Sequence, residues 1–308
     1  MHADGPAMVL AGPGSGKTFV TVHRIQRLLT SQGVDPAHIL VITFTKAAAL
    51  EMQQRFFRLM GEGNLPVRFG TFHAVFYHIL KQSAQYRNYT IITETEKRKL
   101  VRDIIHNHKR FVYLQEEDIE GIITAVSTYK IKAAERELSE KKGGTEGTEK
   151  PGTANDGRAD GIENTPGFQK MEQADFQFLY KEYEDWLNEI SKFDFDDLMT
   201  SCIQLLRENK ETLSAWQAQF RYILVDEFQD ISPIQYEIIR LLAAPENNLF
   251  VVGDDDQSIY GFRGASPDCM KRFLADFAQA KQILLDVNFR CHRDIVQAAV
   301  KVIAENES

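Results

Sequence analysis

The sequence predicts an α/β fold, in which a parallel β-sheet is covered by helices on both faces and interrupted by an inserted helical subdomain. Three observations carry this prediction. Short runs of consecutive apolar residues recur along the chain, most are followed by a stretch with helical spacing, and the runs disappear between Gly70 and Tyr222. Strands that are apolar throughout, rather than at alternate positions, are typical of a parallel sheet buried on both faces.

Five apolar runs are predicted to be buried parallel strands, because each is bounded by Gly, Asp or Thr. They are Met8–Ala11, Ile39–Ile42, Tyr222–Val225, Leu249–Val252 and Ile283–Val287. Helices are expected at Thr18–Thr30, Ala47–Leu59, Thr95–Asn107 and Ile234–Ala243.

Amphipathic helical patterns replace the strands in the middle of the chain, as in Met171–Ile190 and Phe195–Leu206. We therefore expect a first segment of the α/β domain over 1–84, an inserted helical subdomain over 85–215, and a second segment of the α/β domain over 216–308. Within the insertion, 143–167 is rich in Gly, Thr, Glu, Asn and Asp. Such a composition buries too little apolar surface to offset the cost of ordering, so a mobile loop is predicted there.

The composition is that of a folded protein, with 308 residues, 43% of them hydrophobic, and a net charge of −8. The charge is uneven, because twelve basic residues stand against five acidic ones between Lys46 and Arg110. This asymmetry can place a basic surface, suited to a polyanion, on an acidic protein. Solvated helix faces that bind nothing explain the same charges, so both interpretations stay open.

The cysteines and the apolar runs restrict the setting of the protein. Cys202, Cys269 and Cys291 are far apart and form no Cys-x-x-Cys pair, which predicts reduced thiols rather than disulfides or a zinc site. No apolar run approaches the roughly 20 residues that cross a bilayer. The N-terminus lacks the apolar core of a signal peptide. A cytoplasmic protein without membrane contact is expected.

Residues 11–18 read AGPGSGKT between a predicted strand and a predicted helix, which is the context of a P-loop. Its glycines let successive backbone N–H groups turn toward phosphates at a helix N-terminus. Lys17 would reach the β- and γ-phosphates, and Thr18 would hold Mg²⁺ through its hydroxyl. The alternative is a Gly-rich structural turn. The expected nucleotide contacts are Gly12, Pro13, Gly14, Ser15, Gly16, Lys17 and Thr18.

A pair of carboxylates, Asp226 and Glu227, follows the strand predicted at Tyr222–Val225. An acidic residue at the carboxyl end of a buried parallel strand faces the crevice where ligands bind in such sheets. Asp226 would hold the metal, and Glu227 could orient and deprotonate the attacking water. Both could instead cap the following helix. Beside a P-loop, the pair favours hydrolysis of ATP with Mg²⁺.

The ordered motifs of the chain resemble those of the superfamily 1 DNA helicases of the UvrD/Rep/PcrA type. The motifs are AGPGSGKT (11–18), TFTKAAALEM (43–52), GTFH (70–73), DFDDLM (194–199), VDEFQD (225–230), VGDDDQSIYGFRGA (252–265) and NFR (288–290). The resemblance implies a RecA-like P-loop NTPase fold. It also implies ATP-driven 3′-to-5′ translocation on single-stranded DNA with duplex unwinding, in repair or replication.

The same resemblance implies roles for further residues. Gln257 would sense the γ-phosphate, and Arg290 would act as a cationic finger on the transition state. Phe289 stands where the family usually has a Tyr that stacks on adenine. The DNA contacts would be Phe44, Thr45, Thr71, His73, Tyr260, Phe262 and Arg263, a set in which aromatic residues suit base stacking.

The sequence departs from the family pattern at several positions. In the family, a Gln that reads adenine lies upstream of the P-loop, and the ten residues that precede Ala11 here do not include it. Phe19 replaces an Arg that flanks adenine in the family. We hypothesise that Phe19 and Phe289 sandwich the base instead. Binding of GTP as tight as that of ATP would contradict this hypothesis. Phe262 replaces a Trp, while Lys46 and Ala47 stand where Asn and Lys are common. The family's second RecA-like domain is absent from this sequence.

The leading interpretation is the N-terminal motor half of a UvrD-like helicase, acting on single-stranded DNA or a duplex junction and unable to unwind alone. A standalone nucleotide-dependent DNA- or protein-binding module would share every ATP-site residue. The DNA-facing set, including Phe44, His73, Tyr260 and Arg263, favours the motor half. A small-molecule kinase is disfavoured, because no acceptor pocket is evident and VDEFQD favours attack by water.

Overall fold

The computed structural model describes residues 4–61, 63–140, 169–257 and 268–303. Its strands are β1 (Ala7–Ala11), β2 (Ile39–Thr43), β3 (Arg68–Thr71), β4 (Thr90–Ile91), β5 (Lys192–Phe193), β6 (Tyr222–Val225), β7 (Leu249–Gly253) and β8 (Lys281–Leu285). Its α-helices are α1 (Lys17–Thr30), α2 (Lys46–Met60), α3 (Phe72–Gln82), α4 (Glu94–Asn107), α5 (Ile119–Glu140), α6 (Gln173–Glu189), α7 (Phe195–Glu208), α8 (Lys210–Gln219), α9 (Pro233–Ala243), α10 (Asp268–Asp276) and α11 (Arg293–Ile303). The loop predicted at 143–167 lies outside the described residues.

The chain divides into two compact units, one formed by 1–75 with 205–308 and the other by 76–204. Both unit boundaries fall inside helices, since α3 and α7 each contribute residues to both units. The boundaries expected from the sequence, 84/85 and 215/216, lie further along the chain. The observed boundaries give no signal in the sequence, because a single helix, α3 or α7, runs through each of them.

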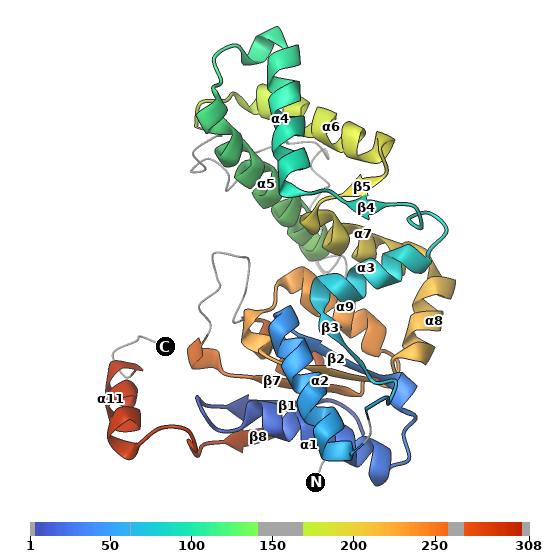
Figure 1. Cartoon of the computed structure of the whole chain (residues 1–308), viewed down its shortest axis with the longest axis vertical. Helices are drawn as coiled ribbons and strands as arrows, with labels where there is room; N and C mark the ends of the chain where they lie inside the picture. The colour runs from blue at the N-terminus through green and yellow to red at the C-terminus, as the bar shows by residue number, and fades with distance from the viewer. Residues whose placement is uncertain (1–3, 62, 141–168, 258–267, 304–308) are drawn as a thin grey trace, which may run out of the picture. The chain divides into compact units, whose positions relative to one another are not determined.

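The first unit contains a six-stranded parallel sheet with the strand order β3-β2-β6-β7-β1-β8 (Figure 1). All of its strands run in the same direction, so their carboxyl ends share one edge, where parallel sheets bind ligands. The parallel α/β sheet predicted from the apolar runs is confirmed, and it agrees with the RecA-like fold that the resemblance implies.

Alternating residues of the central strands pack on opposite faces of the sheet. Val9 of β1, Val41 of β2 and Val252 of β7 face α1 and α2, where they join Ile25 and Phe56 in one apolar core. The intervening residues, such as Met8, Leu40 and Val251, are buried as well. Burial on both faces explains why these strands read as continuous apolar runs.

Two edge strands differ from the prediction. The last run, Ile283–Val287, was expected to form a buried strand. The strand observed is β8, whose one pairing partner among the described residues is β1, and Leu284 is 68% exposed. An edge strand has one neighbour and less cover, which the apolar composition alone did not reveal. At the opposite edge, β3 was missed because its sequence, RFGT, is short and carries one apolar side chain.

The second unit has its own apolar core between α4, α5 and α6, with Val101, Val126, Phe176 and Leu179 among its buried residues. A two-stranded parallel sheet, β4 and β5, also belongs to this unit. The helical insertion expected from the sequence therefore builds an independent core.

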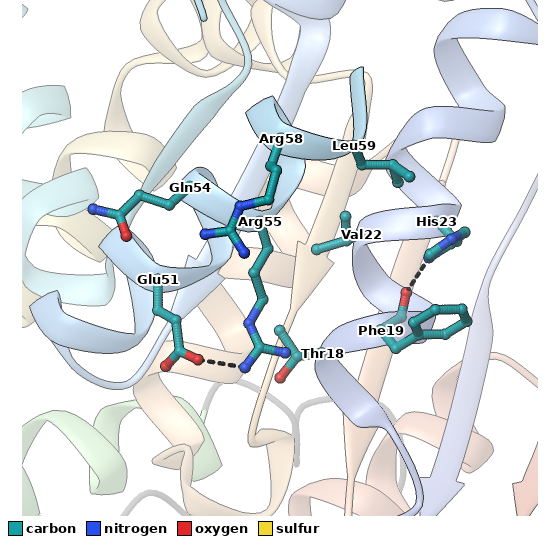
Figure 2. Close-up of a pocket in the computed structure, with 9 residues that line it drawn as sticks. All are labelled: Thr18, Phe19, Val22, His23, Glu51, Gln54, Arg55, Arg58 and Leu59. Atoms are coloured by element: carbon teal, nitrogen blue, oxygen red, sulfur yellow. Dashed lines mark hydrogen bonds and ion pairs between the residues drawn. The ribbon is translucent and has the colours of Figure 1, made fainter. Parts of the chain in front are cut away.

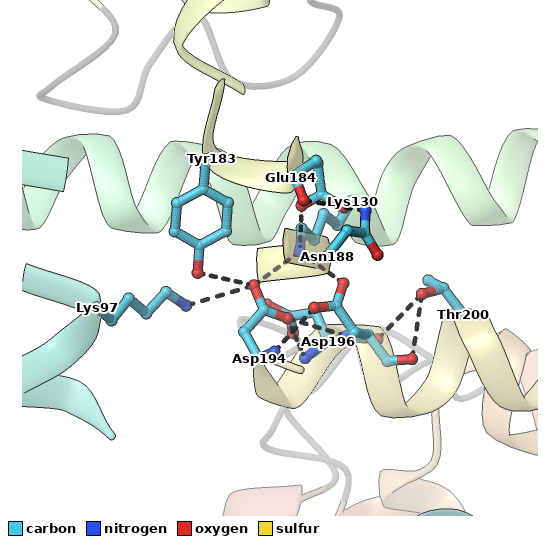
Figure 3. A network of polar contacts seen from close by, with 9 residues as sticks. Lys97, Lys130, Tyr183, Glu184, Asn188, Asp194, Asp196 and Thr200 are labelled. Carbon is cyan, nitrogen blue, oxygen red and sulfur yellow. Dashed lines mark hydrogen bonds and ion pairs between the residues drawn. The ribbon is translucent and has the colours of Figure 1, made fainter. Parts of the chain in front are cut away.

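A buried polar cluster lies where α5, α6 and α7 of the second unit meet (Figure 3). The Nζ atom of Lys130, whose side chain is 3% exposed, lies 2.8 Å from Asp194 Oδ2, 2.5 Å from Asp197 Oδ1 and 2.6 Å from Glu184 Oε1. Asp194 and Asp197 also cap α7 reciprocally, because each carboxylate accepts the backbone N–H of the other residue, at 2.8 and 2.9 Å. The DFDD motif thus starts a helix and supplies two of the carboxyl groups around Lys130.

Several basic residues of the segment Lys46–Arg110 are paired with acidic residues. Lys97 is buried, with its Nζ 3.8 Å from Asp194 Oδ2. Three arginines of α4 and the following turn pair with acidic residues outside the segment, as the pairs Arg98–Glu120, Arg102–Glu116 and Arg110–Asp175. The local excess of positive charge is therefore partly neutralised by the fold.

None of the helices within the described ranges combines the length and the apolar character that a bilayer crossing requires.

Candidate nucleotide-binding site

The P-loop connects β1 to α1 at the carboxyl edge of the sheet. Gly14 and Gly16 have φ angles of 69° and 97°, a left-handed conformation that side chains disfavour. The Ser15 hydroxyl donates to the Gly12 carbonyl at 2.7 Å and closes the turn. Helix α1 starts directly at Lys17, so the predicted P-loop occupies the strand–loop–helix context that phosphate binding requires.

Lys17 lies between two carboxylates from neighbouring strands. Its Nζ atom is 3.5 Å from Glu227 Oε2 and 3.7 Å from Asp254 Oδ2, and its side chain is 12% exposed. Glu227 follows β6, as predicted. Asp254, which follows β7 and is buried, was missed as a site residue, although a carboxylate directly after an apolar run was the available signal.

Asp226 and Glu227 occupy the end of β6 in different ways. The Asp226 N–H donates to the Ile42 carbonyl at 2.9 Å, which extends the β2–β6 ladder and buries the Asp226 side chain at the sheet edge. Glu227 has φ 51° and ψ 48°, and its side chain is 38% exposed. A non-glycine residue in this conformation costs about 1–2 kcal/mol, and such residues cluster at functional sites.

The carboxylates outnumber the cations near Lys17. Burial, followed by the charge of Glu227, raises the pKa of Asp226 to about 6 and that of Asp230 to about 6. Burial also raises the pKa of Asp254, against the opposing effect of Lys17. The buried Oδ1 atoms of Asp226 and Asp230 have no hydrogen-bond partner within the described part of the chain. A divalent cation near Asp226 would balance this excess of negative charge.

Gln229 is a second residue that sequence reasoning missed. Its buried amide donates from Nε2 to Glu227 Oε2 at 2.9 Å and accepts the Asp254 N–H on Oε1 at 3.0 Å. Gln257, which follows Asp254 in a short 3₁₀ turn, donates from Nε2 to Asp254 Oδ2. Two glutamine amides therefore orient the carboxylates on either side of Lys17.

A cavity of about 300 Å³ gathers most of the predicted ATP-site residues. Its lining includes Lys17 and Thr18 of α1, Glu227, Gln257 and Arg290, together with Pro13, Gly14, Gly16, Phe19, Glu51 and Arg55. Side chains that are far apart in the sequence thus converge on one space beside the P-loop. Of these lining residues, Glu51 and Arg55 of α2 were not predicted.

A second cavity, of about 570 Å³, adjoins the first and lies between α1 and α2 (Figure 2). It shares Thr18, Phe19, Glu51 and Arg55 with the first cavity. The Phe19 ring packs against His23, with the ring centroids 3.8 Å apart. Phe19 is 62% exposed and Phe289 is 79% exposed, so each of the two rings leaves surface accessible for stacking.

Four of the predicted DNA contacts lie at or just after the ends of two adjacent strands. Phe44 and Thr45 follow β2, Thr71 ends β3, and His73 lies in the first turn of α3. Thr43 of β2 pairs with Thr71 of β3, so the two segments leave the sheet at the same edge. Thr45 and Thr71 cap the starts of α2 and α3, because their hydroxyl oxygens accept the N–H groups of Ala48 and Ala74 at 3.1 and 3.3 Å. Burial lowers the pKa of His73, which favours its neutral form near pH 7.

The other three predicted DNA contacts, Tyr260, Phe262 and Arg263, lie outside the described residues. Among the residues that are described, no group of three or more His, Cys, Asp or Glu side chains is arranged to hold a metal ion. A metal at this site would therefore rest on few protein ligands, as Mg²⁺ bound to phosphates commonly does.

Comparison with known proteins gives a match over most of the chain. Residues 1–278 match the family model described as the UvrD/REP helicase N-terminal domain. The chain is similar to the ATP-dependent DNA helicase PcrA of Staphylococcus epidermidis, with 36% identity over 311 residues that cover 98% of this chain and 38% of that protein.

Two further relatives give the same result. PcrA of Staphylococcus aureus is 34% identical over 312 residues, which cover 98% of this chain and 38% of the relative. YjcD of Bacillus subtilis is 35% identical over 313 residues, which cover 100% of this chain and 37% of the relative. The chain thus spans less than two fifths of the length of the curated relatives that it matches.

Proposed function

The chain belongs to the UvrD/REP helicase family, and from this premise we propose that it binds and hydrolyses ATP as the N-terminal motor half of a DNA helicase. The motor would move 3′-to-5′ on single-stranded DNA and serve repair or replication. The observation that carries the ATPase proposal is the convergence of Lys17, Asp226, Glu227 and Arg290 on the carboxyl edge of one parallel sheet.

The residues present fit a nucleoside triphosphate with Mg²⁺. Lys17 Nζ and Asp226 Oδ1 are buried and have no hydrogen-bond partner among the described residues, so each can take a ligand of opposite charge. Thr18 and Asp226 would hold Mg²⁺, which neutralises charge on the phosphates when it is bound. The backbone N–H groups of Gly14, Gly16 and Lys17 can donate to phosphate oxygens at the start of α1.

The neighbouring side chains would perform the reaction. Lys17 would leave its two carboxylate partners for the β- and γ-phosphates, which frees Glu227 to accept a proton from the attacking water. Gln257 can orient that water or the γ-phosphate through its amide. The Arg290 guanidinium would offset the charge that develops during phosphoryl transfer.

The DNA proposal rests on the shared location of Phe44, Thr45, Thr71 and His73. An aromatic ring and a largely neutral imidazole can stack on bases, while two threonine hydroxyls can donate to phosphates. These residues lie at the ends of β2 and β3, which belong to the same sheet as β1, so DNA bound there would lie at the sheet edge that carries the P-loop.

The proposal is tested by measuring ATP hydrolysis by the chain with and without single-stranded DNA. Lys17→Ala removes the main cation on the β- and γ-phosphates and should lower the rate by about 10²–10³-fold. Lys271→Ala is the matched control, because Lys271 is a lysine of the same unit whose side chain is 85% exposed. Equal rates for wild type and Lys17→Ala would refute ATP hydrolysis at this site.

The same measurement separates the competing functions. Phosphate release without any acceptor argues against a small-molecule kinase. ATP binding without Lys17-dependent hydrolysis favours a standalone nucleotide-dependent binding module. Binding of GTP as tight as that of ATP would contradict the proposed Phe19 and Phe289 sandwich for adenine.

A further inference from the structure

The segment that follows β8 lies against the P-loop. The Gly12 N–H donates to the Leu285 carbonyl at 3.3 Å, and the Phe289 N–H donates to the Gly14 carbonyl at 3.0 Å. Two residues of the P-loop, Gly12 and Gly14, are therefore joined to the segment that carries Phe289 and Arg290. The side chain of Asn288 adds further hydrogen bonds between the same two segments.

Asn288 uses both ends of its amide. Its Nδ2 atom donates to the Pro13 carbonyl at 2.6 Å, while its Oδ1 atom accepts the backbone N–H groups of Arg290 and Cys291, each at 2.8 Å. The partners fix the orientation of the amide, since the Pro13 carbonyl can only accept and the two N–H groups can only donate. One planar group thus links the P-loop to the turn that contains Arg290.

The loop and the turn approach each other closely at Gly14. A Cβ atom at this position would lie 2.8 Å from Arg290 Cβ and 2.9 Å from the Asn288 amide atoms. A side chain at position 14 would not fit, so the P-loop and the turn are in close contact there. Arg290 lines the same cavity as Lys17 and Thr18, which places its exposed side chain at the phosphate end of the site.

We propose that Asn288 is a positioning residue that ties Arg290 to the P-loop, so that the guanidinium is aligned with the phosphates only while Asn288 spans Pro13 and the turn. The proposal rests on the proposed ATPase function and adds a residue that acts through Arg290. Since the Arg290 side chain is exposed, its location depends on the backbone that Asn288 holds.

Two substitutions of Asn288 separate the roles of its amide nitrogen and its amide oxygen, and a third variant is the control. Asn288→Ala removes every contact of the side chain. Asn288→Asp keeps the acceptor for the Arg290 and Cys291 N–H groups but places a second acceptor against the Pro13 carbonyl. Asp286→Ala is the matched control, because Asp286 is an exposed residue of the same segment.

Hydrogen exchange of the backbone amides tests the connection without nucleotide. Asn288→Ala should speed exchange at Arg290 and Cys291 by about 2–10-fold, the effect of losing one net hydrogen bond at each. Asn288→Asp should leave these two amides protected and speed exchange at Phe289, whose bond to Gly14 depends on the connection to the loop. Unchanged exchange at Phe289 in both variants would overturn the proposal.

Steady-state ATP hydrolysis tests whether Asn288 acts through Arg290. Asn288→Ala should lower kcat by about tenfold and change KM by less than about twofold, because only the alignment of a transition-state contact is lost. In an Arg290→Ala background the same substitution should change kcat by less than about twofold. A full tenfold loss in that background would show that Asn288 acts independently of Arg290.

The two proposals fail in different ways. Equal hydrolysis by wild type and Lys17→Ala refutes the ATPase function, and the exchange experiment still decides whether Asn288 joins the loop to the turn. Lys17-dependent hydrolysis combined with unchanged kcat in Asn288→Ala refutes the positioning role alone.

Discussion

Glu227 and Lys17 show how the residues of the site depend on their supports. Glu227 is held in a left-handed backbone conformation, its carboxylate accepts from Gln229, and the Gln229 amide in turn accepts the Asp254 N–H. Lys17 lies between the carboxylates of Glu227 and Asp254, the two residues that this amide connects. The orientation of the proposed general base is therefore determined by buried residues in the segments that follow β6 and β7.

Gly253 is the position at which this arrangement can be tested. A Cβ atom on Gly253 would lie 2.9 Å from Gln229 Oε1, so Gly253→Ala must displace the amide from the Asp254 N–H. We expect a loss of about 1–2 kcal/mol in the free energy of unfolding, with slower ATP hydrolysis. Urea denaturation measures the loss, and Gly63→Ala is the control, because its Cβ would meet nothing within 4 Å. Equal stability of the two variants would contradict this expectation.

Phe44 gives a prediction for the proposed DNA interface. Loss of one base-stacking ring is worth about 1–3 kcal/mol, so Phe44→Ala should weaken binding of single-stranded DNA by about 5–150-fold. Fluorescence anisotropy with a labelled oligonucleotide measures this change. Leu284→Ala, a substitution of another apolar residue in the same unit that is 68% exposed, should leave the affinity unchanged. Affinities that match between the two variants would exclude Phe44 from the interface.

At the scale of the elements, the buried cluster between α5, α6 and α7 makes the second unit sensitive to pH. The cluster contains the carboxylates of Asp194, Asp197 and Glu184 around the ammonium groups of Lys130 and Lys97. Three acids against two cations favour uptake of one proton. Burial, followed by the charge of Asp194, raises the pKa of Asp197 to about 8.

The sign of the resulting pH dependence follows from the proton count. The folded protein keeps a proton on Asp197 that the unfolded chain loses above its ordinary pKa, so stability falls as pH rises toward 8 and levels off above it. Between about pH 5 and 7 the free energy of unfolding should fall by about 1.4 kcal/mol per pH unit, and the fall should become shallower through pH 8.

Asp197→Asn isolates this contribution, because the amide does not titrate. Asp197→Asn should therefore flatten the dependence of the free energy of unfolding on pH in that window, even if the substitution also changes the stability itself. Hydrogen exchange of amides in α5 and α6 across the same window measures the slope for this unit, and Asp185→Asn on the same helix as Glu184 serves as the control. A slope as steep in Asp197→Asn as in wild type would assign the titration to another group.

Particular elements show what the sequence could predict. Central strands such as β2 and β7 were found because burial on both faces leaves a continuous apolar run, and α1 and α2 because one face of each is apolar. The edge strands β3 and β8 were missed or assigned too much burial, since pairing on a single side leaves no comparable pattern.

The site shows the same division. Lys17 and Asp226 belong to motifs whose spacing along the chain carries their chemistry. Asp254, Gln229 and Asn288 act through contacts between strands and loops that are distant in sequence, such as the bond from Asn288 to Pro13. Local patterns contain no signal for such contacts, and only the strand order of the folded sheet brings these residues together.

At the scale of the whole molecule, the chain covers 38% of the PcrA helicase of Staphylococcus epidermidis. One α/β unit can bind and hydrolyse a nucleotide, but stepping along DNA requires two bodies that close and open over it. We therefore expect ATP binding and weak hydrolysis by this chain without processive strand separation. A fluorescence unwinding assay on a tailed duplex tests this expectation, and ATP-dependent strand separation by the chain alone would contradict it.

The distribution of the three thiols has a practical consequence for such work. Cys202 and Cys269 are buried, whereas Cys291 is exposed and directly follows Arg290. A maleimide dye added to the folded protein should therefore attach at one position, beside the proposed phosphate site, without any substitution. The native chain thus carries a ready attachment point for a fluorescent reporter of events at its P-loop.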